Sequence, residues 1–230
     1  EIVLDRAPRH EAAARAILRI HEQEGRWEHA IAAERKLLEL ATRPEDVLEG
    51  LLRIARICEE QLGRIDDAIA AYLEALDCAP GHAPTVYALE RLLRAKGDYE
   101  RLAHVLQRFA DATPDRHARV RAILRSAVVL ELCLGDTGAA SAAYGRALSL
   151  AGPAGDPDRD AALWGLLRLQ EVRGEWDDVD TTLHAILETT SDPTTRMRVL
   201  VRRGRNAELR LGDLARAATL YEEALTTQNS

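Results

Sequence analysis

The sequence predicts an all-α protein in which about six antiparallel helical hairpins stack side by side as an α-solenoid. The first observation is that six glycines recur 34 to 39 residues apart, at positions Gly25, Gly63, Gly97, Gly135, Gly174 and Gly212. A period of about 20 to 50 residues is typical of chains that stack one small unit, because a single unit cannot bury its apolar face alone. The second is that the segments between the glycines have helical apolar periodicity, and no run reads as a strand.

Each of these glycines is expected to be the corner between two helices. Glycine fits the left-handed residue just past a helix end, where other side chains meet a steric penalty. Acidic residues follow several of them, as in Gly97-Asp98, Gly174-Glu175 and Gly212-Asp213. A carboxylate there suits the positive end of the next helix. We call these six residues the corner glycines.

The corner glycines place the hairpins in order along a single solenoid of residues 1–230. We expect the hairpins at 10–41, 44–79, 83–111, 114–150, 157–189 and 193–226. Two subtypes alternate, so the true unit is a pair of hairpins, 72 residues long at first and 77 residues later. The five extra residues fall in the connector 151–157, which has two Gly and two Pro. This connector is a candidate flexible seam.

First helices start at capping residues and have an apolar stripe. Thr113-Pro114, Asp156-Pro157 and Asp192-Pro193 each read as a capping side chain followed by proline at the first helical position. The stripe of the second hairpin is Leu51, Ala55, Cys58 and Leu62, and that of the fourth is Ile123, Ala127, Leu130 and Leu134.

Second helices show the clearest helical period. In the even hairpins one face is Ala68, Ile69, Tyr72, Ala75 and Leu76, repeated as Tyr144, Ala147 and Leu148 and as Tyr221, Ala224 and Leu225. In the odd hairpins larger residues take these places, namely Leu102, Leu106 and Phe109 in the third hairpin and Val179, Leu183 and Ile186 in the fifth. We expect these faces, together with Trp27, Tyr99 and Trp176, to form the core.

The phrase Gly63-x-Ile65-x-x-Ala68-x-x-x-Tyr72-x-x-Ala75-Leu76-x-x-x-Pro80 resembles the second half of the tetratricopeptide repeat. The resemblance implies a right-handed superhelix whose first helices line a concave groove. The chain departs from the family pattern in three respects, one of which is that its repeat spacing often exceeds the family's usual unit. The small glycine usual in the family's first helix appears only near Gly204, and Leu102 and Val179 replace the usual alanine of the second helix. The odd hairpins are therefore degenerate members of the pattern.

A second alignment concerns the start of the sequence. Residues 3–10 parallel residues 75–82 at an offset of 72, so residues 1–8 are expected to be the tail of a preceding repeat's second helix. On this interpretation the chain is a fragment of a longer array. We expect its exposed end repeats to associate end to end with other molecules, because solenoids need polar capping repeats.

Composition indicates an ordered chain that is 47% hydrophobic and 30% charged, with a net charge of −7. No apolar run approaches the roughly 20 residues that span a bilayer, so no membrane contact is expected. Lys36 and Lys96 are the only lysines, and this arginine-rich usage indicates a bacterial origin. The three cysteines lack paired spacing, which predicts free thiols and a cytoplasmic location.

Catalytic and ligand-binding motifs were sought along the whole sequence. A phosphate loop needs Gly-Lys-Ser/Thr, but Lys96 is followed by Gly97 and Lys36 by Leu37. The seven histidines form no metal-binding motif with each other or with cysteine. The sequence therefore predicts a protein that is not an enzyme and has no cofactor or metal.

The candidate binding residues lie ten residues before each corner glycine or four residues further along the same first helix. We call them the groove residues: Arg15, Arg19, Arg53, Tyr87, Arg91, Arg125, Trp164, Arg168, Arg202 and Asn206. Arginine forms forked hydrogen bonds with carboxylates, and aromatic side chains act as anchors. These residues predict a positive groove that binds an acidic peptide or helix of a protein partner.

A second interpretation of these residues is ordinary solvated surface. The arginines would then be neutralised by Glu11, Glu22, Glu49 and Glu60 a turn away, with Tyr87 and Trp164 packed between hairpins.

Three functional classes are open. The favoured one is a protein interaction scaffold or adaptor module. The second is a regulatory domain of a larger signalling protein that senses a ligand or peptide in the groove. RNA binding is disfavoured, because the chain is acidic and its period is irregular.

Overall fold

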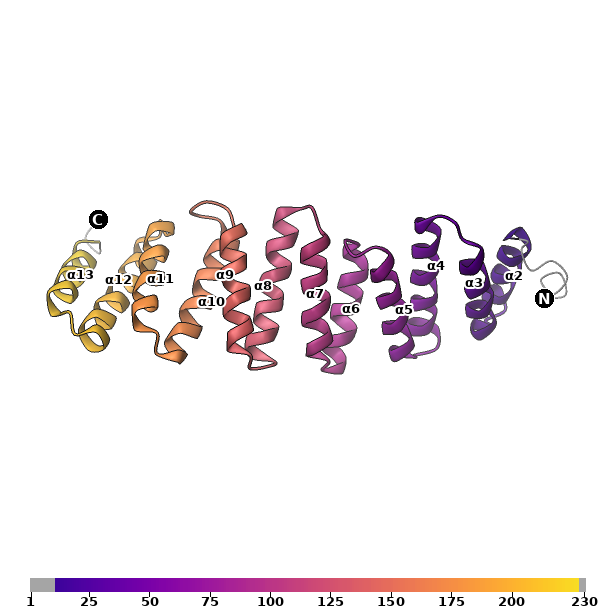
Figure 1. Cartoon of the computed structure of the whole chain (residues 1–230), viewed down its shortest axis with the longest axis horizontal. Coiled ribbons are helices and arrows are strands. Elements are labelled where there is room, and N and C mark those ends of the chain that lie inside the picture. The colour runs from indigo at the N-terminus through magenta and orange to yellow at the C-terminus, as the bar shows by residue number, and fades with distance from the viewer. Residues whose placement is uncertain (1–10, 228–230) are drawn as a thin grey trace. The chain divides into compact units, whose positions relative to one another are not determined.

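The computed structural model describes residues 11–227, and over that range the chain contains twelve α-helices, two π-helical turns and no strand (Figure 1). The predicted repeat tail at residues 1–8 lies outside the described residues. The chain divides into two compact units, Glu1–Ala112 and Thr113–Ser230.

Unit 1 contains three antiparallel hairpins in which each helix packs on the next. Its helices are α2 (Glu11–Gln23), α3 (Trp27–Leu40), α4 (Pro44–Arg56) with the π-helical turn η1 (Ile57–Gln61), α5 (Ile65–Cys78), α6 (Ala83–Lys96) and α7 (Tyr99–Ala112).

Unit 2 repeats the arrangement. Its helices are α8 (Arg116–Leu132), α9 (Thr137–Leu150), α10 (Pro157–Arg173), α11 (Trp176–Thr189), α12 (Pro193–Asn206) with the π-helical turn η2 (Ala207–Leu211), and α13 (Leu214–Thr227).

All six corner glycines have left-handed backbones, as predicted. At Gly97, where φ is 74°, the Gly97 amide donates to the Arg94 carbonyl at 3.1 Å and the Asp98 amide donates to the Leu93 carbonyl at 3.0 Å. These bonds satisfy the last carbonyls of α6 and reverse the chain within two residues.

Two of the three predicted helix starts are confirmed. Asp156 and Asp192 cap α10 and α12, and proline occupies the first turn of each helix. The start at Thr113-Pro114 is wrong, because α8 begins at Arg116 and its capping carboxylate is that of Asp115, which accepts from the His117 amide at 3.0 Å. Asp115 competes successfully because carboxylates are stronger caps than threonine.

The connector 151–157 is tied by hydrogen bonds. Asp156 accepts from the amides of Asp158 at 2.9 Å and Gly152 at 2.6 Å, and Gly155 has a left-handed φ of 87°. The Asp158 amide is the main cause that holds the pKa of Asp156 below its ordinary value, with a smaller contribution from the Gly152 amide. The role of this connector as a flexible seam stays a prediction.

The predicted apolar faces form the core, with five exceptions. The five face residues of α5 are buried, as are the three named face residues of α7 and of α11. Leu134 is 36% exposed and Leu225 is 65% exposed, so these two positions are corrections to the predicted faces. The other three exceptions, Leu62, Leu148 and Tyr221, are half-buried.

The aromatic residues that follow three of the corner glycines lie at the edge of the core. Trp27 packs against a cluster that includes Leu18 and Ile57, and Trp176 packs against one that includes Leu183. Trp27, Tyr99 and Trp176 each remain half-buried, so they are not core residues in the full sense that the sequence predicts.

Small residues let neighbouring helices approach closely. A Cβ on Gly165 of α10 would overlap the Tyr144 ring of α9, and a Cβ on Gly204 of α12 would come within 2.7 Å of the Tyr221 ring of α13. Sequence analysis identified only Gly204 of these, because Gly165 contacts the preceding hairpin and not its own.

Candidate functional site

The predicted groove residues all lie on the first helices of their hairpins, in both units. In unit 1 they belong to α2 (Arg15, Arg19), α4 (Arg53) and α6 (Tyr87, Arg91), and in unit 2 to α8 (Arg125), α10 (Trp164, Arg168) and α12 (Arg202, Asn206).

Four of the arginines pair with a glutamate on the preceding first helix or the π-helical turn that continues it. Ten residues before a corner glycine, Arg53 lies 3.7 Å from Glu22, and Arg202 binds both oxygens of Glu171 at 2.9 and 2.5 Å. Six residues before a corner glycine, Arg91 pairs with Glu59 and Arg168 pairs with Glu131. The second interpretation of these residues is therefore partly right: acidic side chains hold the arginines, but from the neighbouring hairpin.

A tyrosine joins the pairs made by Arg91 and Arg168. Glu131 accepts from Arg168 Nε at 2.5 Å and from the Tyr144 hydroxyl at 2.8 Å. Arg168 is the main cause that lowers the pKa of Glu131. Burial, followed by the hydrogen bond to Glu131, raises the pKa of Tyr144 to about 12. We call each such set a Tyr–Glu–Arg cluster; the other complete one is Tyr72, Glu59 and Arg91.

The remaining groove residues differ in accessibility. Arg15 pairs with Glu11 at 2.7 Å within α2, whereas Arg19 is exposed and has no ion pair with any described residue. Tyr87 is 57% exposed and Trp164 is 36% exposed. Arg125 is half-buried.

Asn206 does not lie open on the surface. It is buried, and its Nδ2 donates to the Trp176 carbonyl at 2.9 Å. Among the residues that the structure describes, its Oδ1 has no hydrogen-bond partner. The Asn206 side chain therefore links α12 to the start of α11. The spacing of the groove residues in the sequence did not predict this hydrogen bond.

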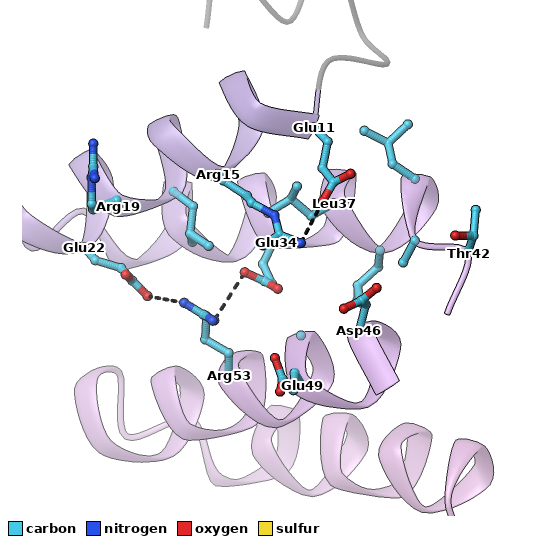
Figure 2. Close-up of a pocket in the computed structure, with 15 residues that line it drawn as sticks. Glu11, Arg15, Arg19, Glu22, Glu34, Leu37, Thr42, Asp46, Glu49 and Arg53 are labelled. Atoms are coloured by element: carbon cyan, nitrogen blue, oxygen red, sulfur yellow. Dashed lines mark ion pairs between the residues drawn. The ribbon is translucent and has the colours of Figure 1, made fainter. Parts of the chain in front are cut away.

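Three groove residues line a hollow of about 400 Å³ between α2, α3 and α4 of unit 1 (Figure 2). Figure 2 shows Arg53 reaching toward Glu22 and Glu34, and Arg15 paired with Glu11. Five carboxylates surround the three arginines of this hollow, those of Glu11, Glu22, Glu34, Asp46 and Glu49. This hollow is acidic overall, contrary to the positive groove that the arginines alone suggested.

Glu34 is the feature of this hollow that sequence analysis missed. It is only 6% exposed, its Oε2 forms no hydrogen bond with any residue in 11–227, and the Arg53 guanidinium lies 3.5 Å from that oxygen. Burial is the main cause that raises the pKa of Glu34, and Arg53 opposes it. A signal was available, because the equivalent residue in later hairpins is apolar or aromatic, as at Leu106 and Leu183.

Two further hollows, one in each unit, lie at equivalent repeat positions of the described residues. We call these the tryptophan hollows. The hollow of unit 1, about 370 Å³, is lined by Glu22, Trp27, Arg53, Arg56, Ile57, Glu60 and Gln61. The hollow of unit 2, about 340 Å³, is lined by Glu171, Trp176, Val179, Arg202, Arg205, Asn206, Leu209 and Arg210.

The two tryptophan hollows differ in charge. In unit 1 two arginines face two glutamates, whereas in unit 2 three arginines face the single carboxylate of Glu171. Arg210 lies over the Trp176 ring with its guanidinium carbon 4.4 Å from the ring centroid. Such a contact stabilises the cation on the indole face. The unit 2 hollow is therefore positive within a chain of net charge −7.

Each tryptophan hollow is bordered by a π-helical turn. In η1 the Leu62 amide donates to the Ile57 carbonyl at 3.1 Å, and η2 lies one residue nearer its own corner glycine. One extra residue per turn shifts the side chains of Gln61 and Arg210 relative to a regular helix. Sequence periodicity did not reveal either turn. π-Helical turns are frequent at functional sites.

Neither a group of residues able to hold a metal ion nor a helix long and apolar enough to cross a membrane occurs between residues 11 and 227.

Two tetratricopeptide repeat family models match the chain, one at residues 48–82 and the other at residues 85–117. These segments include Gly63 and Gly97, two of the corner glycines. Residues 48–82 and 85–117 are therefore tetratricopeptide-like repeats. The predicted all-α repeat class is thereby confirmed, and tetratricopeptide-like repeats indicate a protein interaction scaffold.

One solved structure with a TM-score above 0.5 agrees with the repeat fold. A chain of the Naa15/Naa10 structure bound to HypK-THB matches 98% of this sequence at 20% identity and a TM-score of 0.58, over 33% of that chain. PilF of Pseudomonas aeruginosa matches 91% of it at 18% identity and a TM-score of 0.44, over 88% of that chain.

A tetratricopeptide repeat protein from Parabacteroides merdae matches 94% of the chain at 14% identity and a TM-score of 0.42, over 93% of that protein's chain. No curated protein matches this sequence.

Proposed function

We propose that this tetratricopeptide-like protein is a scaffold module that binds a peptide or helix of a protein partner along its first helices, and that the tryptophan hollow of unit 2 holds an acidic side chain of that partner. The observation that carries the proposal is the set of three arginines around the Trp176 indole with one opposing carboxylate.

The arrangement of the arginines supports recognition of a carboxylate. Arg202 is fixed by two hydrogen bonds to Glu171, yet its side chain remains 41% exposed. Arg205 forms no ion pair with a described residue, and Arg210 is held over the indole. Guanidinium groups that are already oriented lose less conformational freedom when a carboxylate forms a forked hydrogen bond with them.

An apolar contact accompanies the positive charge. Leu209, which is 69% exposed, lines the same hollow beside Trp176. Exposed ion pairs contribute only about 0.2 to 1 kcal/mol each, so an apolar anchor is needed for useful affinity. We therefore expect the partner to present an acidic residue next to an apolar one.

The first test uses two fluorescein-labelled helix-forming peptides of about 16 residues, one with glutamates and leucines on one face and one with glutamine in place of glutamate. Fluorescence anisotropy with the purified chain measures both affinities. We expect the acidic peptide to bind about tenfold more tightly than its glutamine analogue, because the analogue makes no charge-assisted hydrogen bonds.

The two units provide a matched control for this test. The double variant Arg205→Glu and Arg210→Glu should weaken acidic peptide binding by about tenfold or more, whereas Arg56→Glu with Gln61→Glu, at the equivalent positions of unit 1, should leave it within about twofold. Circular dichroism checks that both variants fold. Equal effects of the two double variants, equal binding of the two peptides, or no binding would contradict the proposal.

A further inference from the structure

Exposed apolar side chains gather in unit 2. Of the large apolar residues that are exposed between residues 11 and 227, nine belong to unit 2 and three to unit 1. Six of the nine lie on first helices or on η2, and we call four of these six the apolar face: Leu132 of α8, Trp164 and Val172 of α10, and Leu209 of η2. Large exposed apolar patches on a folded domain usually mark a binding surface.

An ion pair joins the α8 and α10 parts of the apolar face. Trp164, Arg168 and Val172 lie four residues apart on α10, so they share one side of that helix. Arg168 binds Glu131, the residue before Leu132 on α8. Leu132 therefore borders the exposed stripe of α10.

A second ion pair continues the apolar face to α12. Arg202 binds both oxygens of Glu171, the residue before Val172. Arg202 and Leu209 line the tryptophan hollow of unit 2. The apolar face therefore ends at the hollow that we propose for an acidic side chain.

The exposure of this face belongs to its repeat positions and not to an end of the chain. Helix α10 packs against α8, α9 and α11, yet Val172 is 75% exposed. The position three residues before a corner glycine, which Leu132 and Leu209 occupy, is also exposed at Glu60 and Arg94. Charged residues take this position in unit 1, so the apolar face is a property of unit 2.

The charges along the apolar face decide what it fits. The two arginines between its apolar side chains already bind glutamates, so these ion pairs add no net charge to the α8 and α10 part. The α12 end is positive, because Arg205 and Arg210 line the tryptophan hollow and form no ion pair with a described residue. The surface is thus apolar along most of its length and positive at one end.

We propose, resting on the function proposed above, that the apolar face binds the same partner segment as the tryptophan hollow of unit 2, and that this segment has acidic residues at one end and apolar residues along the remainder. The acidic end enters the hollow beside Arg205 and Arg210, and the apolar part crosses α10 toward α8. An acidic residue placed over Val172 or Leu132 would lose its water without gaining a cation.

The first test compares three fluorescein-labelled helix-forming peptides of identical composition. Each has about 16 residues, which span about 24 Å as a helix, enough to cross three first helices about 10 Å apart. Two peptides group their glutamates at one end or at the other, with leucines along the rest of the same face, and the third alternates glutamate and leucine.

Fluorescence anisotropy with the purified chain measures the three affinities. One grouped peptide should bind about tenfold more tightly than the alternating one, because only the grouped order matches both parts of the surface. Equal affinities would overturn the proposal. The function proposed above would survive that result if Arg205→Glu with Arg210→Glu still weakened binding.

The second test removes apolar surface without changing any charge. Leu132→Gln with Val172→Thr should weaken binding of the better grouped peptide by about tenfold, with the salt dependence unchanged. Ile65→Thr with Leu214→Gln is the matched control, because both residues are exposed but lie on the second helices α5 and α13. It should leave the affinity within about twofold, and circular dichroism checks that both variants fold.

An unchanged affinity in the Leu132 and Val172 variant, or an equal loss in the control, would overturn the proposal. Sedimentation equilibrium of the same variants tests the other occupant, a second copy of this chain. If the Leu132 and Val172 variant loses self-association and keeps its peptide affinity, the apolar face binds a second copy and the proposal is wrong.

Discussion

Several polar side chains of this protein form their hydrogen bonds and ion pairs with residues of a neighbouring helical hairpin. Arg168, Glu131 and Tyr144 come from three successive helices, and each makes its main polar contact with the other two. Because the Tyr144 side chain is buried, the cluster is both a packing contact and an ion pair. Its stability should therefore depend on the protonation of the phenol.

The first residue-scale prediction concerns high pH. The pKa of Tyr144 is about 12 in the folded chain, against an ordinary value of 10.0, so the folded chain holds this proton more tightly than the unfolded chain does. The stabilisation is complete below pH 10 and is lost as pH rises from about 10 to about 12. Tyr144→Phe should make this fall in the free energy of unfolding shallower. Urea denaturation at several pH values measures it, and an unchanged slope would contradict the assignment.

At the scale of helices, the closeness of α9 and α10 depends on Gly165. This residue lies where a Cβ would overlap the Tyr144 ring, and that ring is held by Glu131 and Arg168. Gly145 of α9 is also a glycine inside a helix, but the space around it is open. The same substitution at the two positions should have opposite effects.

Gly165→Ala should lower the free energy of unfolding by about 1 to 3 kcal/mol, because the ring must move in a packed junction. Gly145→Ala should raise it by about 0.5 to 1 kcal/mol, because alanine restricts the unfolded chain and favours helix. Denaturant titration of the two variants side by side decides the matter. Equal signs would mean that the close approach of α9 and α10 does not limit packing.

Local features of the sequence predicted the helices well and the site only in part. A glycine past a helix end and an apolar face of period 3.6 depend on neighbouring residues, so the corner glycines and the faces of α5, α7 and α11 were predictable. The Arg202–Glu171 pair depends on how far one hairpin is offset from the next, and sequence spacing does not give that offset. The burial of Asn206 was missed for the same reason. The burial of Glu34 could have been predicted from the apolar residues at the same repeat position, and the π-helical turns have no signal in the apolar periodicity.

At the scale of the whole molecule, the repeated hairpins form two hollows of similar lining that differ in charge. The tryptophan hollows of unit 1 and unit 2 occupy the same repeat positions, but Gln61 and Glu60 of the first are replaced by Arg210 and Leu209 in the second. The net charge of −7 therefore does not describe either site. We expect partner binding to distinguish the two units.

The most direct measurement is the indole N–H spectrum of the chain during titration with the acidic helical peptide. The three tryptophans, Trp27, Trp164 and Trp176, give three such signals, which single Trp→Phe variants assign. The account predicts that the Trp176 signal shifts in proportion to occupancy while the Trp27 signal stays in place. A shift of Trp27 in preference to Trp176, or no shift of Trp176 at saturating peptide, would contradict it.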